Sequence, residues 1–115
     1  MSNPHGIDQT LIQGYLDNLG KQVVQQMLDL YIQQSVVYID DINGSLDTKV
    51  QEQWHERCHK MKGAAGSVGL TEVHALLVSI EKSTENWETK RAHISRLTNL
   101  NSEAISQFKQ WLETV

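Results

Sequence analysis

The chain of 115 residues has one proline, one cysteine and no apolar run near the ~18 residues that a membrane-spanning helix needs. The single cysteine, Cys58, excludes an internal disulfide and suits a reducing compartment. The net charge of −4 argues against nucleic-acid binding, because such proteins present a basic face that neutralises phosphates. No signal-peptide pattern is present. We therefore expect a soluble, cytoplasmic protein that binds neither membrane nor nucleic acid.

The length and the 39% hydrophobic content fit one compact domain over residues 1–115. Only residues 1–6, Met-Ser-Asn-Pro-His-Gly, have the composition of a flexible tail. Elsewhere the apolar residues recur at spacings of three and four, which indicates helices. We therefore predict an all-α fold, an antiparallel four-helix bundle with a short N-terminal cap helix.

Capping and turn signals predict where the helices begin and end. We expect helices over about residues 8–19, 21–42, 47–67, 71–82 and 87–113. Asp8 is a suitable N-cap for the first and Gly20 a suitable end, whereas Asn43, Gly44 and Ser45 predict a turn before a cap at Asp47. A narrow apolar stripe on the second helix is the expected docking surface of the first; it consists of Val23, Leu30 and Val37.

The third predicted helix separates an apolar face from a polar one. At ~100° per residue, one face collects apolar side chains and is expected to enter the core. These side chains are Val50, Trp54, Cys58, Met61, Ala65 and Val68. His59 lies roughly 140° from the centre of this face, so it is expected in solvent, together with His55, Lys62, Gly63 and Gly66.

The neighbours of His59 point to a reactive histidine. A glycine inside a helix costs about 1 kcal/mol relative to alanine, so Gly63 and Gly66 need a reason. Both lie away from the apolar stripe, and we infer that they let a bulky partner approach the backbone beside His59, rather than serve close helix packing. Lys62, one turn after His59, suits a charge-assisted hydrogen bond to a phosphoryl group. Lys60 and Arg57 make the neighbourhood locally basic in an acidic protein.

A neutral imidazole is a usable nucleophile that needs no base to remove a proton before it attacks phosphorus. The sequence contains no phosphate-binding glycine loop and no carboxylate cluster for Mg²⁺. The phosphoryl donor and any metal must therefore come from another protein.

The run from His59 to Leu70, His-Lys-Met-Lys-Gly-Ala-Ala-Gly-Ser-Val-Gly-Leu, resembles the signature of histidine-containing phosphotransfer (HPt) domains, namely His, two residues, Lys-Gly and a further Gly. Within this family it is most similar to C-terminal HPt domains of hybrid kinases of the anoxic redox control type. The resemblance implies a phosphocarrier of a bacterial two-component phosphorelay, with no kinase or ATPase activity and no cofactor of its own. Its partners would be receiver domains of a hybrid sensor kinase and a response regulator, which supply Mg²⁺. We expect a monomer, and a chain that begins at Met and ends after its last helix is expected to be free-standing.

By this match His59 would be the phosphoacceptor, with Lys62 stabilising the phosphoryl charge. Gly63 would give the receiver steric access, and Gly66 is expected to do the same. Lys60 and His55 are expected at the rim of the docking surface, although His55 lies outside the family pattern and its role stays open.

Two other functions compete with this interpretation. His55-Glu56-Arg57-Cys58-His59 matches the His-Glu-x-x-His zinc motif, but such a short motif occurs by chance, and a catalytic zinc also needs a third ligand and a substrate cleft. We predict no metal site. The other alternative is a helical adaptor that binds a partner without chemistry and carries no labile phosphate.

Overall fold

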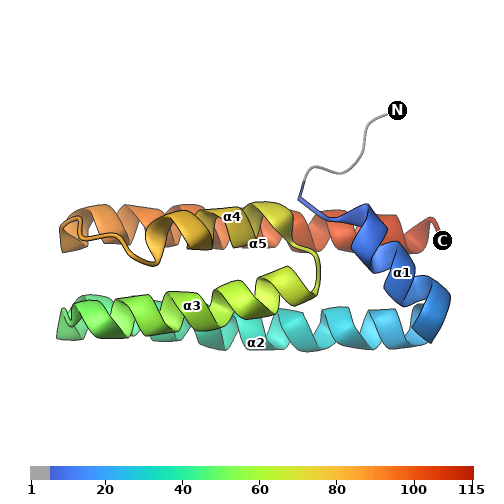
Figure 1. Ribbon diagram of the computed structural model, residues 1–115, viewed down its shortest axis with the longest axis horizontal. Coiled ribbons are helices and arrows are strands. Elements are labelled where there is room, and N and C mark those ends of the chain that lie inside the picture. The colour runs from blue at the N-terminus through green and yellow to red at the C-terminus, as the bar shows by residue number, and fades with distance from the viewer. Residues whose placement is uncertain (1–5) are drawn as a thin grey trace.

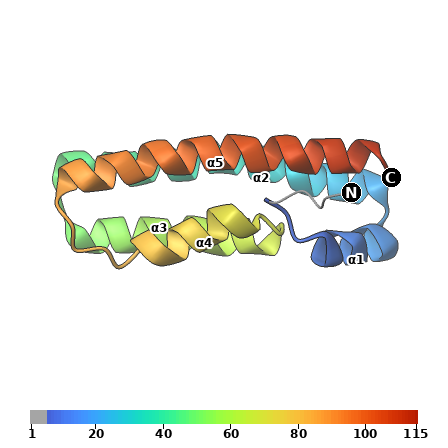
Figure 2. The ribbon, with the colours of Figure 1, turned by 90° about the horizontal axis from the view of Figure 1, so that it is seen from above.

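The computed structural model describes residues 6–115, and every regular element in that range is a helix. The helices are α1 (Gln9–Leu19), α2 (Lys21–Thr48), α3 (Gln51–Ser67), α4 (Thr71–Ile80) and α5 (Trp87–Glu113). Both α3 and α5 contact α2 and α4, so these four helices close a ring around one core, and the chain reverses at each connection (Figures 1 and 2). The all-α prediction is confirmed. None of the helices that the structure describes is long and apolar enough to cross a membrane.

The core forms where the predicted apolar faces meet. Five of the six predicted core residues of α3 are buried, namely Trp54, Cys58, Met61, Ala65 and Val68. Val50 is instead 41% exposed, because it precedes the helix as its N-cap. On α4 the apolar stripe that faces the core is buried; it consists of Val73, Leu76, Leu77 and Ile80. The polar face of α3, which holds His59, is consequently directed to solvent.

The predicted turn at residues 43–45 is wrong, because α2 continues to Thr48. Ser45 and Leu46 are buried and extend the inward stripe by one turn beyond Ile42. This burial outweighs the turn propensity of the Asn-Gly-Ser sequence. The helix ends at Lys49, which has the left-handed φ of 54°. Asp47 therefore lies inside α2 and does not cap α3.

The first helix begins and ends as predicted, but it docks elsewhere. The Asp8 side chain caps its first turn by accepting from the Leu11 amide at 3.1 Å. The predicted docking stripe on α2 stays exposed, at 39% for Val23, 54% for Leu30 and 58% for Val37. Instead α1 lies across one end of the bundle, beside the α3–α4 turn (Figure 1).

Backbone hydrogen bonds attach the start of the described chain to the α3–α4 turn. The Asp8 amide donates to the Gly69 carbonyl at 2.7 Å, and the Thr71 amide donates to the Gly6 carbonyl at 3.1 Å. Gly6 is buried, so it does not belong to the predicted flexible tail. Residues 1–5, the rest of that prediction, lie outside the described residues. Gly69, just after the C-cap of α3, has a positive φ of 76°, a backbone conformation that commonly follows the end of a helix and favours glycine.

Candidate functional site

His59 lies on the solvent side of α3, where its side chain is 65% exposed. The residue before it in the sequence, Cys58, is fully buried, so the predicted division of the helix into two faces is confirmed. Burial raises the pKa of the Cys58 thiol to about 12, which keeps it protonated and unreactive. Among these neighbours the accessible nucleophile is therefore the imidazole.

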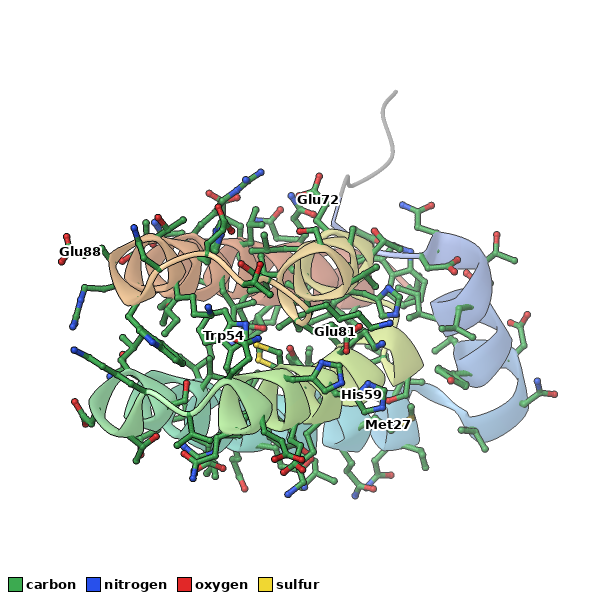
Figure 3. The ribbon with its side chains drawn as sticks, turned by 60° about the vertical axis from the view of Figure 1, so that its left-hand side comes forward. Met27, Trp54, His59, Glu72, Glu81 and Glu88 are labelled. Atoms are coloured by element: carbon green, nitrogen blue, oxygen red, sulfur yellow. The ribbon has the colours of Figure 1, made fainter. Side chains whose placement is uncertain are left out.

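A carboxylate from the next helix reaches this imidazole. Glu81, which directly follows α4, has a side chain that is only 5% exposed. Its Oε1 lies 3.1 Å from Nδ1 of His59, and its Oε2 accepts from Nζ of Lys62 at 2.6 Å. Figure 3 shows His59 and Glu81 side by side between their helices. One carboxylate thus binds the two side chains that the sequence pattern had singled out separately.

The ionisation of Glu81 determines which imidazole nitrogen carries the proton. Burial acts to raise the pKa of this carboxyl, but the hydrogen bonds from Lys62 and His59 outweigh it and hold the pKa below its usual range. Glu81 is therefore ionised at neutral pH and accepts hydrogen bonds only. Its contact with Nδ1 of His59 requires the proton on that nitrogen, which leaves the lone pair on Nε2, across the ring from Glu81.

The segment around Glu81 is held because side chains of α3 and α5 bind backbone carbonyls at the end of α4 and in the α4–α5 connection. The last carbonyls of a helix have no partner within it. Nε1 of Trp54 donates to the Ile80 carbonyl at 2.8 Å, and Nδ1 of His55 lies 3.2 Å from the Glu81 carbonyl. Beyond α4, Nε2 of Gln51 donates to the Ser83 carbonyl at 2.8 Å.

The α5 contribution comes from Lys90, which is 1% exposed. Its Nζ donates to the Glu85 carbonyl and lies 4.6 Å from the centre of the Trp87 ring. Lys90 thereby holds the α4–α5 connection, the segment that follows Glu81.

The two glycines beside His59 have different surroundings. A Cβ built on Gly63 meets nothing within 4 Å, so this stretch of helix is open as predicted. A Cβ on Gly66 would lie 3.0 Å from Cδ2 of His74 on α4. The inference that neither glycine serves helix packing is therefore wrong for Gly66, because α3 and α4 approach closely there.

The other predicted site residues lie around this centre. His55 is half-buried, and its ring is nearly parallel to that of His59, with centroids 6.2 Å apart. Lys60 is exposed. Arg57 is turned away, because its Nη1 donates to the Asp41 carbonyl of α2 at 2.7 Å.

The zinc motif gains no third ligand from the fold. Within residues 6–115 no three His, Cys, Asp or Glu side chains come together so that they could hold a metal ion. Glu56, the acidic residue of the motif, is exposed.

Glu81 lies outside the sequence motif around His59. One signal was nevertheless present, because Glu81 stands four residues after Leu77 and one after Ile80, on the edge of the inward stripe of α4. A carboxylate at such a position requires a buried partner. The sequence does not indicate that His59 and Lys62 are those partners.

Comparison with known proteins gives one matching family and two similar solved structures. A family model described as the Hpt domain matches residues 26–115. The chain is similar to the solved histidine-containing phosphotransfer domain of ArcB from Escherichia coli, with a TM-score of 0.83 and 23% identity over 96% of this chain and 95% of that one. It is also similar to the solution structure of the histidine-containing phosphotransfer domain of the anaerobic sensor kinase ArcB from Escherichia coli, with a TM-score of 0.81 and 24% identity over 94% and 88% of the two chains. A search among curated proteins finds no significant match. At these identities the structural likeness shows the fold alone.

Proposed function

The chain belongs to the Hpt domain family, and from this premise we propose that it is the phosphocarrier of a bacterial phosphorelay, with His59 as the phosphoacceptor. In this proposal α2 to α5 are the antiparallel four-helix bundle of the family and α1 is its cap helix. The partners are receiver domains of a hybrid sensor kinase and a response regulator, which also supply Mg²⁺. The carrier itself acts as a monomer and hydrolyses no nucleotide.

The observation that carries the proposal is the state of the His59 imidazole. The ring is exposed, and its Nδ1 proton is held by Glu81, so the lone pair of Nε2 is available for attack. Nε2 attacks the phosphorus of a receiver's aspartyl phosphate, the P–O bond breaks, and its electron pair returns to the aspartate. Transfer onward is the reverse step with the carboxylate of a second receiver.

The neighbours of His59 support this transfer. The open surface at Gly63 admits a flat receiver surface to the helix backbone. Lys62 is held by the same carboxylate as His59, and we propose that its ammonium stabilises the charge of the phosphoryl group. Lys60 and His55 form the rim of this docking surface. A docking role for Gly66 has less support, since its close approach to the His74 ring already accounts for a glycine at this position.

The test uses a receiver domain that has been phosphorylated on its aspartate with a radioactive label. We expect the label to move to the wild-type protein as an acid-labile, base-stable phosphate. His59→Gln should accept none. The matched control is His93→Gln, because His93 is also paired with a carboxylate, Glu85, at 2.8 Å. This control should accept the label normally, since it retains His59. No transfer to the wild type, or equal transfer to His59→Gln, would refute the proposal and favour an adaptor without chemistry.

A further inference from the structure

We propose that Glu81 is a positioning residue whose negative charge keeps the Nδ1 proton on His59 after phosphorylation and thereby keeps the phosphoryl group transferable. The inference rests on the proposed function, and it concerns the charge of Glu81 rather than the hydrogen bond alone. An uncharged acceptor at the same place would orient the ring equally well.

The chemistry of the phosphorylated ring makes this proton important. When neutral imidazole attacks through Nε2 and keeps its proton on Nδ1, the product is a positively charged phosphoimidazolium. If a receiver carboxylate then attacks phosphorus, the N–P electron pair returns to Nε2 and neutral imidazole leaves. If the Nδ1 proton has been lost, the leaving group is instead an imidazolide anion, which is a far poorer one. Onward transfer therefore needs the proton to remain.

The geometry places a buried negative charge against that proton. Oε1 of Glu81 lies 3.1 Å from Nδ1, and the carboxylate is 5% exposed, so solvent screens it weakly. A carboxylate that binds the far nitrogen of a reacting imidazole stabilises the imidazolium in the same way as the aspartate of a Ser-His-Asp triad. Glu81 is itself prevented from taking up the proton by Lys62, which binds its other oxygen at 2.6 Å.

The other charged groups around the ring do not replace Glu81. Lys62 on α3 carries the wrong sign to hold a proton on Nδ1, and the imidazole of His55 cannot supply a negative charge. From α4 only Glu81 approaches the ring, and within residues 6–115 the hydrogen bonds, ion pairs and ring contacts of His59 reach Glu81 and His55 alone. No titratable side chain of α2 takes part.

The experiment compares the wild type with Glu81→Gln after phosphorylation of both by phosphoramidate, a small P–N donor that needs no receiver. The amide oxygen of glutamine still accepts from Nδ1 but carries no charge. Opposite charges at this separation shift a pKa by about 1–3 units. We therefore expect the phosphoimidazole resonances of Glu81→Gln, followed by phosphorus and nitrogen NMR, to titrate at a pH lower by about 1 unit or more. The pH profile of onward transfer to a receiver should move by the same amount, which is about a tenfold loss of rate on its alkaline side.

Glu85→Gln is the matched control, because Glu85 also pairs with a histidine, His93, but outside the site. It should leave the titration unchanged. Since Glu81→Gln also frees Lys62, both proteins are compared again with Lys62→Gln present, and the shift should persist. Equal titration of wild type and Glu81→Gln would overturn the inference while leaving the proposed function standing. Absence of phosphate on His59 in every protein would instead refute the proposed function.

Discussion

Replacement of Gly63 by alanine should stabilise the protein. Gly63 lies inside α3 on its exposed side, and a Cβ there meets nothing within 4 Å. An alanine in a helix interior is favoured over glycine by about 0.8–1.0 kcal/mol, because glycine loses more backbone freedom on folding. No clash reduces this gain. Gly63→Ala should therefore raise the free energy of unfolding by about 1 kcal/mol, which corresponds to a melting temperature higher by about 4 °C.

Urea denaturation followed by far-ultraviolet circular dichroism measures this difference, and Gly66→Ala is the control. At Gly66 the added Cβ would lie 3.0 Å from the His74 ring, so the same helical gain is offset by displacement of that side chain. We expect Gly66→Ala to gain clearly less than Gly63→Ala or to lose stability. A destabilised Gly63→Ala would refute the reasoning, because it would mean that the surface at residue 63 does not accommodate an added Cβ.

Larger residues at the same position separate stability from function. Gly63→Leu should remain folded and at least as stable as the wild type, since leucine is also a good helix former. It should nevertheless accept phosphate from a receiver more slowly, because its side chain would occupy the surface on which we propose that the receiver docks. Normal transfer rates in a stable Gly63→Leu would show that the receiver does not approach at this point.

Three further results follow from buried groups. The pKa of Glu81 in the folded protein lies below its ordinary value of 4.5, so its contribution to stability is present above pH 4.5 and is lost as the pH falls through the folded pKa. The wild type should therefore lose more stability than Glu81→Gln when both are titrated with acid. An equal loss in the two proteins would contradict this. Burial raises the pKa of the Cys58 thiol to about 12, so this thiol should react with a disulfide reagent at mildly alkaline pH only after the protein unfolds. Fast labelling of the native protein would be inconsistent with the burial of Cys58. The Tyr31 hydroxyl donates to Oδ1 of Asn101 at 2.7 Å in the core. Tyr31→Phe leaves this oxygen without its donor and should lower the free energy of unfolding, measured in urea, by about 1–3 kcal/mol. An unchanged value would mean that Asn101 finds another donor.

The sequence predicts most of the helices because their signals are local. Residues 87–113 are helical as expected, since Asn86 caps the first turn by accepting from the Thr89 amide at 2.8 Å and the apolar stripe continues to the end. The exposure of His59 follows from the same periodicity. Such features depend only on residues that are neighbours in the sequence.

The errors arise where a tertiary contact decides the outcome. Burial of Ser45 and Leu46 extends α2 through a sequence that favours a turn. Gly66 is explained by His74, which the sequence gives no reason to place beside it. Glu81 belongs to the site because α3 and α4 pack together, and this contact joins residues that are 22 positions apart in the case of His59. Helical periodicity indicates that a residue is inward, but it does not indicate which residue it meets.

The carbonyls of the α4–α5 connection extend the region in which mutations can change the chemistry. Gln51 and Lys90 do not touch His59, yet each binds a carbonyl of the segment that follows Glu81. Under the proposed function, sequence variation at these distant positions would alter the position of the carboxylate and thereby the lifetime of the phosphate on the histidine. A lineage could in this way adjust the timing of its signal without altering any residue of the phosphotransfer motif.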